Sequence, residues 1–437
     1  MNTRPDGPGP TIDWLGQLDG DWPTTTLGRV GRFHMGTTFP HSFQGKTNGD
    51  IPFIKVSDFP LADRGILSTA NNWVSATAVR HLGGRILPRG CVLYPRVGAA
   101  LLLNQRRLTG RPCVVDDNVR GFEPYSGDPR YWRYLMTLLD MGKITNPGPV
   151  PSVSETQVAA VRVPLPPPDE QRRIADFLDA ETTRITALMD ARSSQLRCLE
   201  QLWDARLANK VEELIAIHGL IPLRRVVTSL EQGWSPQCED TESTSSEWAV
   251  LKTSAVSTGR FMPLEHKRLP NDLEPDLRYQ IADGDILMTR GSGSPAHVGV
   301  ATVAKTGGRR LLLSDLLYRV RLDQAWSPEF VTLLLGSLPV RGFASLLFRG
   351  QSGQTIKLRA EDVKSIDIPN VPVTLQSGIA SELLNTQLSI EEAKKVIRQS
   401  YVLLGERRQA LITAAVTGQF DVSTASGRNV TDGVPTS

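Results

Sequence analysis

Two long stretches of the chain carry the pattern of amphipathic helices. The first follows a proline run, where Asp169 can act as an N-cap, and continues from Glu170 to about Ile215 without Pro or Gly. In the second, apolar and small residues recur in alternating steps of four and three from Ile379 to Leu411, which is a heptad seam. A mostly polar helix with one apolar stripe must bury that stripe. We therefore predict two helices, each roughly 65–70 Å long, packed antiparallel as a coiled coil.

The segments outside these helices show the shorter alternation that is typical of β-strands. Apolar and polar positions alternate after Ile51, Gly90, Glu247 and Gly284, and Gly- and Asn-rich stretches separate these runs. Helical patterns are few in these segments. The predicted fold class is α+β, with mixed α/β globules separated by the pair of long helices.

The second half of the chain repeats the first half. The run RILPRGCVLYPRVG from Arg85 recurs as YQIADGDILMTRGS from Tyr279. The run VAAVRVPLPPPDEQRRIA from Val158 lies over VKSIDIPNVPVTLQSGIA from Val363 at an offset of 205. Because such fragments keep their order and a nearly constant offset, they indicate a duplication.

The repeat and the helices divide the chain into five parts. We expect a first target-contacting domain at 1–168, a central long helix at 169–215, a second such domain at 216–373, a C-terminal long helix at 374–420 and a disordered tail at 421–437. The tail is assigned on its small and polar residues, which cannot build a core. The two domains should share one fold, because they are copies.

Composition excludes several classes of protein. The chain has 437 residues, of which 22% are charged and 40% are hydrophobic, as in globular proteins. No apolar run reaches the roughly 18 residues that a membrane span needs, and the first residues lack a signal-peptide pattern, so we expect a cytoplasmic protein without membrane contact. The four cysteines form no C-x-x-C pair, which argues against structural zinc and against a disulfide framework.

The net charge is only +3, but the basic residues are clustered. Seven Arg and no acidic residue lie from Arg80 to Arg111, and four basic residues without an acidic one lie from Phe330 to Ala360. Basic side chains contact phosphates, Arg reads guanine, and Asn or Gln reads adenine. The candidate DNA contacts are Arg96, Asn104, Gln105, Arg106, Arg107, Arg111, Arg290, Arg309, Arg310, Arg349, Gln351, Gln354 and Lys357. For any one of them, a solvated surface residue without a ligand is the alternative.

The chain lacks the motifs of enzymes that modify or cut DNA. A methyltransferase acting on base amino groups would need a glycine-rich cofactor loop and an Asp/Asn-Pro-Pro-aromatic motif, and Asn146-Pro147-Gly148 lacks the aromatic residue. The run from Asp362 to Lys364 fits the Asp-x-Lys pattern of nucleases, but so short a pattern arises by chance in most chains. The histidines have no metal-binding spacing. We predict no catalytic residue, no metal and no cofactor in this chain.

Two segments resemble a known family. VPLPPPDEQRRIADFLDAETTRI from Val163 and ERRQALITAAVTGQF from Glu406 are similar to the central and C-terminal conserved regions of the specificity subunits of type I restriction-modification systems. With the two-copy organisation, the resemblance covers roughly residues 27–422. The second copy departs from the family pattern, since Leu375 and Gln376 replace the Glu-Gln pair.

This resemblance implies a function and a set of partners. Such subunits carry two target-recognition domains, read a bipartite site on double-stranded DNA, and bind two methyltransferase subunits, with restriction and translocation subunits joining the full complex. S-adenosylmethionine is then expected on the methyltransferase subunits and not on this chain. Outward apolar residues of the helices would dock these subunits, or could instead thicken the contact between the two helices. The candidates are Trp203, Leu207, Val396 and Leu403.

Two other hypotheses stay open. The chain could be a self-contained DNA methyltransferase or nuclease with an unrecognised catalytic motif, which methyl transfer by the chain alone with S-adenosylmethionine would reveal. A scaffold without DNA contact is the third hypothesis, and the arginine clustering opposes it. The target sequence, the spacer length and the presence of a restriction subunit do not follow from the residues.

Overall fold

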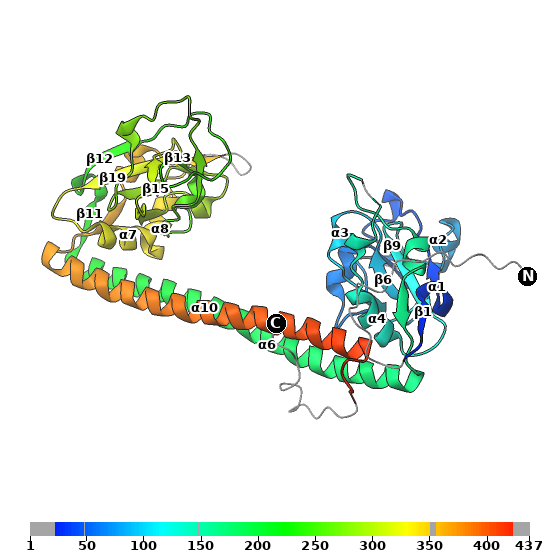
Figure 1. The fold of residues 1–437 in the computed structure, drawn as a ribbon. Coiled ribbons are helices and arrows are strands. Elements are labelled where there is room, and N and C mark those ends of the chain that lie inside the picture. Colours follow the sequence, from blue (N-terminus) through cyan, green and yellow to red (C-terminus); the bar gives the residue numbers. More distant parts are fainter. Residues whose placement is uncertain (1–21, 48, 147, 350–354, 423–437) are drawn as a thin grey trace, which may run out of the picture. The chain divides into compact units, whose positions relative to one another are not determined.

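The chain is described here by a computed structural model that covers residues 22–47, 49–146, 148–349 and 355–422. It divides into two compact units. Unit 1 consists of the residues before Ser193 and those from Gln399 onward, and unit 2 runs from Ser193 to Arg398. Each unit combines a β-rich globule with parts of the long helices α6 (Pro168–His218) and α10 (Val373–Thr417) (Figure 1). The predicted disordered tail lies outside the described residues from position 423 onward.

Unit 1 builds its globule from a five-stranded sheet, a three-stranded sheet and a two-stranded ribbon. Their strands are β1 (Thr24–Thr26), β2 (Gly31–His34), β3 (Ile51–Ile54), β4 (Ile66–Leu67), β5 (Asn72–Val74), β6 (Val92–Pro95), β7 (Arg107–Thr109), β8 (Val114–Val115), β9 (Val119–Pro124) and β10 (Arg162–Pro164). The short helices are α1 (Leu27–Val30), α2 (Ala76–His81), α3 (Ala99–Leu102), α4 (Pro129–Leu138) and α5 (Glu155–Ala159).

Unit 2 has a four-stranded sheet, a three-stranded sheet and two ribbons. Their strands are β11 (Leu220–Pro222), β12 (Val227–Gln232), β13 (Trp248–Leu251), β14 (His266–Arg268), β15 (Ile286–Thr289), β16 (Gly291–Ser292), β17 (Ala301–Val303), β18 (Arg310–Leu312), β19 (Leu317–Leu322), β20 (Ile356–Lys357) and β21 (Asp367–Pro369). The short helices are α7 (Pro328–Gly336), α8 (Leu338–Ser345) and α9 (Ala360–Lys364).

The two globules share one topology, which confirms the internal repeat and the α+β fold class. The order β2-β9-β6-β7 in unit 1 corresponds to β12-β19-β15-β17 in unit 2, and β5-β3-β8 corresponds to β14-β13-β18. In both three-stranded sheets the central strand pairs in parallel with one neighbour, β8 or β18. The offset of 205 reappears where the globules end, since β10 begins at Arg162 and β21 at Asp367, and α6 at Pro168 and α10 at Val373.

The main core of each unit joins the globule to the long helices. In unit 1, Phe122 and Trp132 of the globule belong to the same buried cluster as Leu178 of α6 and Val416 of α10. In unit 2, Phe330 of α7 shares its cluster with residues from both long helices, among them Val211 and Leu383. Burial of these apolar side chains therefore fixes each globule on its own helix segments.

Both long helices end at a glycine in the left-handed conformation. Gly219 has φ +69° and its amide donates to the carbonyl of Ile215 at 2.9 Å, and Gly418 has φ +78°. A residue with a Cβ is strained at such a position, so glycine commonly terminates helices in this way. Compared with the expected helices at 169–215 and 374–420, α6 ends three residues later and α10 ends three residues earlier.

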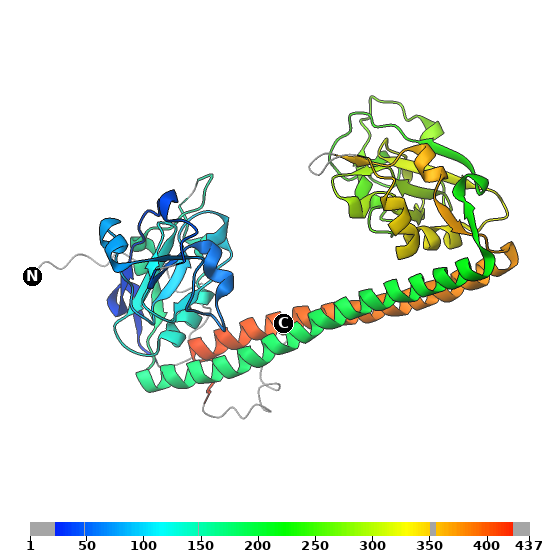
Figure 2. The ribbon, with the colours of Figure 1, turned by 180° about the vertical axis from the view of Figure 1, so that it is seen from behind.

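Within unit 1 the two long helices run antiparallel. The rings of Phe177 and Phe420 lie 5.5 Å apart, whereas Ile185, eight residues further along α6, contacts Leu411, nine residues back along the chain. In unit 2 an ion pair joins the helices, since Arg206 pairs with Glu382 at 2.8 Å, and apolar residues of both helices share one buried cluster. Segments of α6 and α10 lie side by side in the view from behind as well (Figure 2).

Candidate nucleic-acid interface

A polar corner lies in unit 1 where β6 ends and the turn between β8 and β9 begins. Arg96 follows β6, and its Nε donates to the backbone carbonyl of Asp117 at 2.7 Å. The Thr38 hydroxyl donates to the carboxylate of the same Asp117 at 2.7 Å. No other described residue bonds to the two terminal nitrogens of Arg96, so they can reach a ligand.

Unit 2 has the same corner. Arg290 follows β15, and its Nη1 donates to the backbone carbonyl of Asp315 at 3.4 Å. The Ser235 hydroxyl donates to the Asp315 carboxylate. The offsets of 194 for arginine, 197 for the hydroxyl residue and 198 for aspartate follow from the printed sequence and agree with the strand register. Throughout, "the arginine corner" denotes Arg96, Asp117 and Thr38 in unit 1 and their three counterparts in unit 2.

A glycine holds each hydroxyl residue in place. A Cβ on Gly36 would lie 1.8 Å from the carbonyl oxygen of Asp116, and a Cβ on Gly233 would lie 2.1 Å from that of Leu313. Only glycine allows the backbone to approach this closely. The backbone amide of the residue after each glycine donates a hydrogen bond of 2.9 Å to a backbone carbonyl of the facing segment. In unit 1 this is the amide of Thr37, and in unit 2 it is the amide of Trp234.

The surroundings of the two corners differ. Arg120 lies beside Arg96, and its pKa is lowered, first by burial and then by the charge of Arg96. Its place in unit 2 is taken by Tyr318, whose hydroxyl accepts a hydrogen bond from Arg290 Nε at 3.2 Å. The two corners thus present different patterns of charge and hydrogen-bond donors.

Three of the predicted basic residues of unit 2 lie together. The backbones of Arg349 and Lys357 pair at 2.9 and 2.8 Å, and Lys357 pairs with Gly291, directly after Arg290. Lys357 is exposed and Arg349 only weakly approaches Asp362, at 3.8 Å. Two basic residues, Arg349 and Lys357, therefore lie on segments that pair next to the corner of unit 2. Gln351 and Gln354, predicted to read adenine, lie outside the described residues.

The side chains of the predicted polar loop from Asn104 to Arg107 form hydrogen bonds within unit 1. Arg106 is 3% exposed and donates to the carbonyls of Met136, Leu139 and Gln105. Burial lowers its pKa to about 10. The prediction of Arg106 as a DNA contact is therefore wrong, because its guanidinium is enclosed by protein carbonyls.

The other members of this loop are also engaged. The Asn104 side chain accepts from the amide of Met141 at 3.0 Å and donates to Asp140 at 3.3 Å, so its amide group is not free to read a base. Gln105 accepts from Arg107 at 3.3 Å, and Arg107 also donates to two backbone carbonyls. The sequence showed the polar composition of this loop but not that its donors turn inward.

Three further predicted contacts lie away from the arginine corners along the chain. Arg111 is exposed, donates to the carbonyl of Asp50 at 3.1 Å and stacks on Trp73. Arg309 donates to the carbonyl of Ser243 at 3.1 Å, and exposed Arg310 begins β18. β18 belongs to the three-stranded sheet, whereas Arg290 follows a strand of the four-stranded sheet. The structure therefore does not gather these residues into one cluster with the arginine corners.

The predicted docking residues separate into two groups. Val396 and Leu403 are 63% and 61% exposed, as a contact for another chain requires. Leu207 is 4% exposed inside the core of unit 2, so its prediction as a docking residue is wrong; Trp203 is partly buried against the same core. The sequence did not single out Leu388 and Val402, although they are 59% and 56% exposed on α10.

Two kinds of site are absent from the described residues. These residues contain no group of three or more His, Cys, Asp or Glu side chains arranged to hold a metal ion. No helix among them has the length and apolarity to cross a membrane.

Part of this sequence is similar to a known family of domains and to known proteins. Residues 19–197 match the model of the type I restriction modification DNA specificity domain. The EcoEI specificity subunit of Escherichia coli is 29% identical over 160 residues, which are 36% of this chain and 27% of that protein. The EcoKI specificity subunit of Escherichia coli strain K12 is 24% identical over 273 residues, which are 60% of this chain and 58% of that protein. The matched segments thus span only about a quarter to three fifths of these relatives.

The fold has a counterpart among solved structures. A chain solved in work on complex assembly and conformational transition of the type I R-M system superimposes with a TM-score of 0.68 at 15% identity, over 92% of this chain and 100% of that chain. Two copies of one α+β domain, each fixed on its own segments of the long helices, make up the architecture of this chain. By these comparisons the chain is similar to the specificity subunits of type I restriction-modification systems, and its residues 19–197 match their DNA specificity domain.

Proposed function

We propose that this chain is the DNA-reading subunit of a type I restriction-modification complex and that each of its two units reads one half of a bipartite target. One observation carries the proposal: the arginine corner recurs at the same place in both units, while its neighbours differ. A repeated arginine can contact phosphate or guanine in both half-sites. Different neighbours, such as Arg120 and Tyr318, would then give each unit its own preference.

The same proposal assigns the two long helices to assembly. Exposed Val396 and Leu403, together with Leu388 and Val402, give α10 apolar residues that its own unit does not cover. Two methyltransferase subunits would bury these residues and would supply S-adenosylmethionine and the methyl transfer. Restriction and translocation subunits would join through the same complex. The chain itself would contribute recognition and no catalytic group.

A domain exchange tests the reading of separate half-sites. Residues 1–165 are replaced by the corresponding part of another specificity subunit with a known target, and methylated bases are mapped in cells that carry the hybrid. One half of the methylated motif should change while the other half stays. If both halves change, or neither does, a one-unit, one-half-site mechanism is wrong.

A second experiment separates this proposal from an enzyme with an unrecognised motif. The purified chain is incubated with labelled S-adenosylmethionine and a DNA pool, with and without its methyltransferase subunits. Label should enter DNA only when these subunits are present. Transfer by the chain alone would reject the adaptor function.

A further inference from the structure

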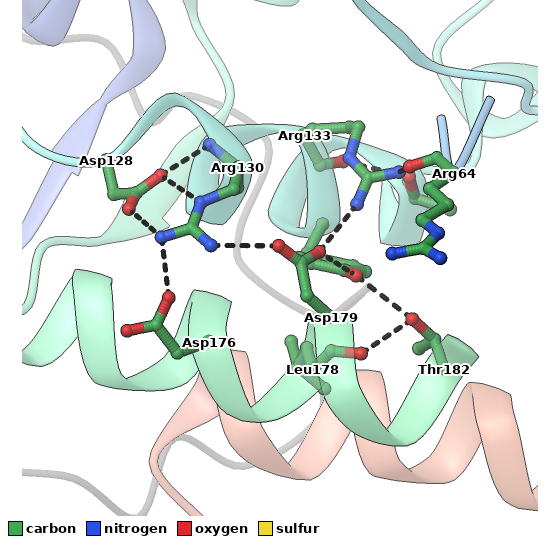
Figure 3. A network of polar contacts seen from close by, with 10 residues as sticks. Arg64, Asp128, Arg130, Arg133, Asp176, Leu178, Asp179 and Thr182 are labelled. Carbon is green, nitrogen blue, oxygen red and sulfur yellow. Dashed lines mark hydrogen bonds and ion pairs between the residues drawn. The ribbon is translucent and has the colours of Figure 1, made fainter. Parts of the chain in front are cut away.

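A network of charged residues fixes α4 of unit 1 on α6. Arg130 pairs with Asp128 at 2.6 Å, with Asp176 at 2.8 Å and with Asp179 at 2.9 Å (Figure 3). Asp179 also accepts from the hydroxyl of Tyr134 at 2.6 Å. Three carboxylates thus surround this one guanidinium, and its charge is neutralised within the protein.

A second group of arginines lies beside this network and forms far fewer ion pairs with carboxylates. Arg133 of α4 donates to the backbone carbonyl of Arg64 at 3.2 Å and to Asp179 at 3.3 Å. A Cβ on Gly65 would lie 1.8 Å from Nη1 of Arg133, so this guanidinium rests on the backbone directly before β4. The backbone carbonyl of Gly65 accepts a hydrogen bond of 2.8 Å from the amide of Leu108, which directly follows Arg107. These contacts bring three arginines together from α4, the β4 edge and β7.

The fourth arginine comes from α10. Arg408 lies one helical turn before Ile412 of α10, which shares a buried cluster with Leu108 and Tyr134, the neighbours of Arg107 and Arg133. Burial, followed by the charges of Arg133 and Arg408, lowers the pKa of Arg107. Arg107 donates only to two carbonyls and an amide oxygen, and Figure 3 shows the Arg64 guanidinium without a bond to the other residues drawn. We call Arg64, Arg107, Arg133 and Arg408 the arginine cluster. Among the described residues, the only ion pair of the cluster joins Arg133 to Asp179, and Arg64 and Arg408 are exposed.

Unit 2 shows that the fold does not require this cluster. The strand register and the offsets of the repeat place Thr302 at the position of Arg107, Thr332 at that of Arg133 and Trp203 at that of Arg408. In unit 2 these three residues line a groove of about 810 Å³. Because the second copy folds with uncharged side chains at these positions, the shared topology does not by itself require positive charge there.

We infer that the arginine cluster of unit 1 is a binding site for backbone phosphates of duplex DNA. Guanidinium groups form paired hydrogen bonds with phosphate oxygens, and an anion would relieve the repulsion among the four like charges. Arg107 and Arg133 are held rigidly by backbone carbonyls, whereas Arg64 and Arg408 have free ends to close on the ligand. The inference rests on the proposed function. It adds a contact that carries no sequence information and that only one of the two units possesses.

The test measures how the affinity for DNA depends on salt. The full chain, assembled with its methyltransferase subunits, is titrated with duplex DNA at several salt concentrations, and Arg64→Gln, Arg408→Gln and the double variant are compared with the unsubstituted protein. Each lost phosphate contact should make the slope of log affinity against log salt shallower by about 0.9. The methylated motif should stay the same. Arg408→Lys, which keeps the charge, should keep most of the slope.

A matched control and two further measurements make the outcome decisive. Arg172→Gln removes another exposed arginine, on α6 outside the cluster, and should leave the slope unchanged. An unchanged slope in the double variant would overturn the inference. Loss of subunit assembly with an unchanged slope would point to an acidic protein partner, and tight binding of inorganic phosphate with an unchanged slope would point to a small anion; either result also overturns it. If the unsubstituted complex binds no duplex, the proposed function itself fails.

Discussion

Gln171 and Gln376 form the same pair of hydrogen bonds in the two units. The Gln171 side chain accepts from the amide of Asp128 at 3.2 Å and donates to the carbonyl of Pro166 at 2.9 Å. Gln376 accepts from the amide of Ser327 at 2.9 Å and donates to the carbonyl of Val371 at 3.0 Å. Both side chains are almost fully buried, at 2% and 1% exposure. Each glutamine thereby ties the start of a long helix to the residue that caps α4 or α7.

Replacing Gln171 by Leu should destabilise unit 1. The substitution leaves a buried amide and a buried carbonyl without partners, and each such group costs about 1–3 kcal/mol. Urea unfolding measures the change in the free energy of unfolding. Gln201→Leu, at an exposed position of α6, should have little effect. Equal stability of the two variants would show that the glutamine is dispensable.

Leu207 and Leu403 should respond in opposite ways to shortening. Leu207→Ala leaves a cavity in the core of unit 2 and should cost about 2–5 kcal/mol of unfolding free energy. Leu403→Ala should change stability by less than about 0.5 kcal/mol, because the side chain is 61% exposed. Pull-down of the methyltransferase subunits should instead be weakened by Leu403→Asp. If Leu403→Asp binds these subunits normally, this part of α10 is no docking surface.

Glu231 should stabilise unit 2 at neutral pH and lose this effect in acid. Its hydrogen bond with Arg319, which is 5% exposed, lowers the pKa of the carboxyl below its ordinary value of 4.5. The folded state therefore holds this proton less tightly than the unfolded state, so the stabilisation is complete above pH 4.5 and is lost as the pH falls through the lower folded pKa.

Glu231→Gln tests this pH dependence. At pH 7 we expect a loss of about 1 kcal/mol, since Glu231 is 38% exposed and water screens the pair. The difference from the unsubstituted protein should shrink below pH 4.5. Thermal unfolding across this pH range measures it, with exposed Glu212→Gln as the control. A difference that stays constant with pH would contradict the assignment.

Matched insertions test whether the helices set the spacer of the DNA target. Met189 and Leu404 belong to one apolar cluster, so an insertion of seven residues after Ala191 faces α10 near Leu404, and not near Lys395 as the sequence spacing had indicated. One heptad adds about 10.5 Å, or roughly three base pairs. Methylation mapping should show a longer gap between unchanged half-sites. An unaltered gap in an active complex would show that the helices do not determine the spacing.

Much of the architecture follows from local sequence patterns. The seam from Ile379 to Leu411 and the proline run before α6 indicate long helices, because periodicity and backbone restrictions act within a few residues. The order of the repeated sequence fragments predicted which elements correspond, and the sheets of the two units share that correspondence. The sequence also singled out Arg96 and Arg290, whose equivalence follows from aligning the two copies.

Tertiary structure alone decided which polar and apolar side chains remain available. Arg106 and Arg107 are neighbours in a run of arginines, yet Arg106 is enclosed by carbonyls while Arg107 joins a cluster with Arg64 and Arg408, which are far away in sequence. Leu207 and Leu403 look alike in a helical pattern, but only the globule of unit 2 covers the first. Periodicity specifies a helix face, whereas burial and hydrogen bonding depend on which distant segment packs against that face.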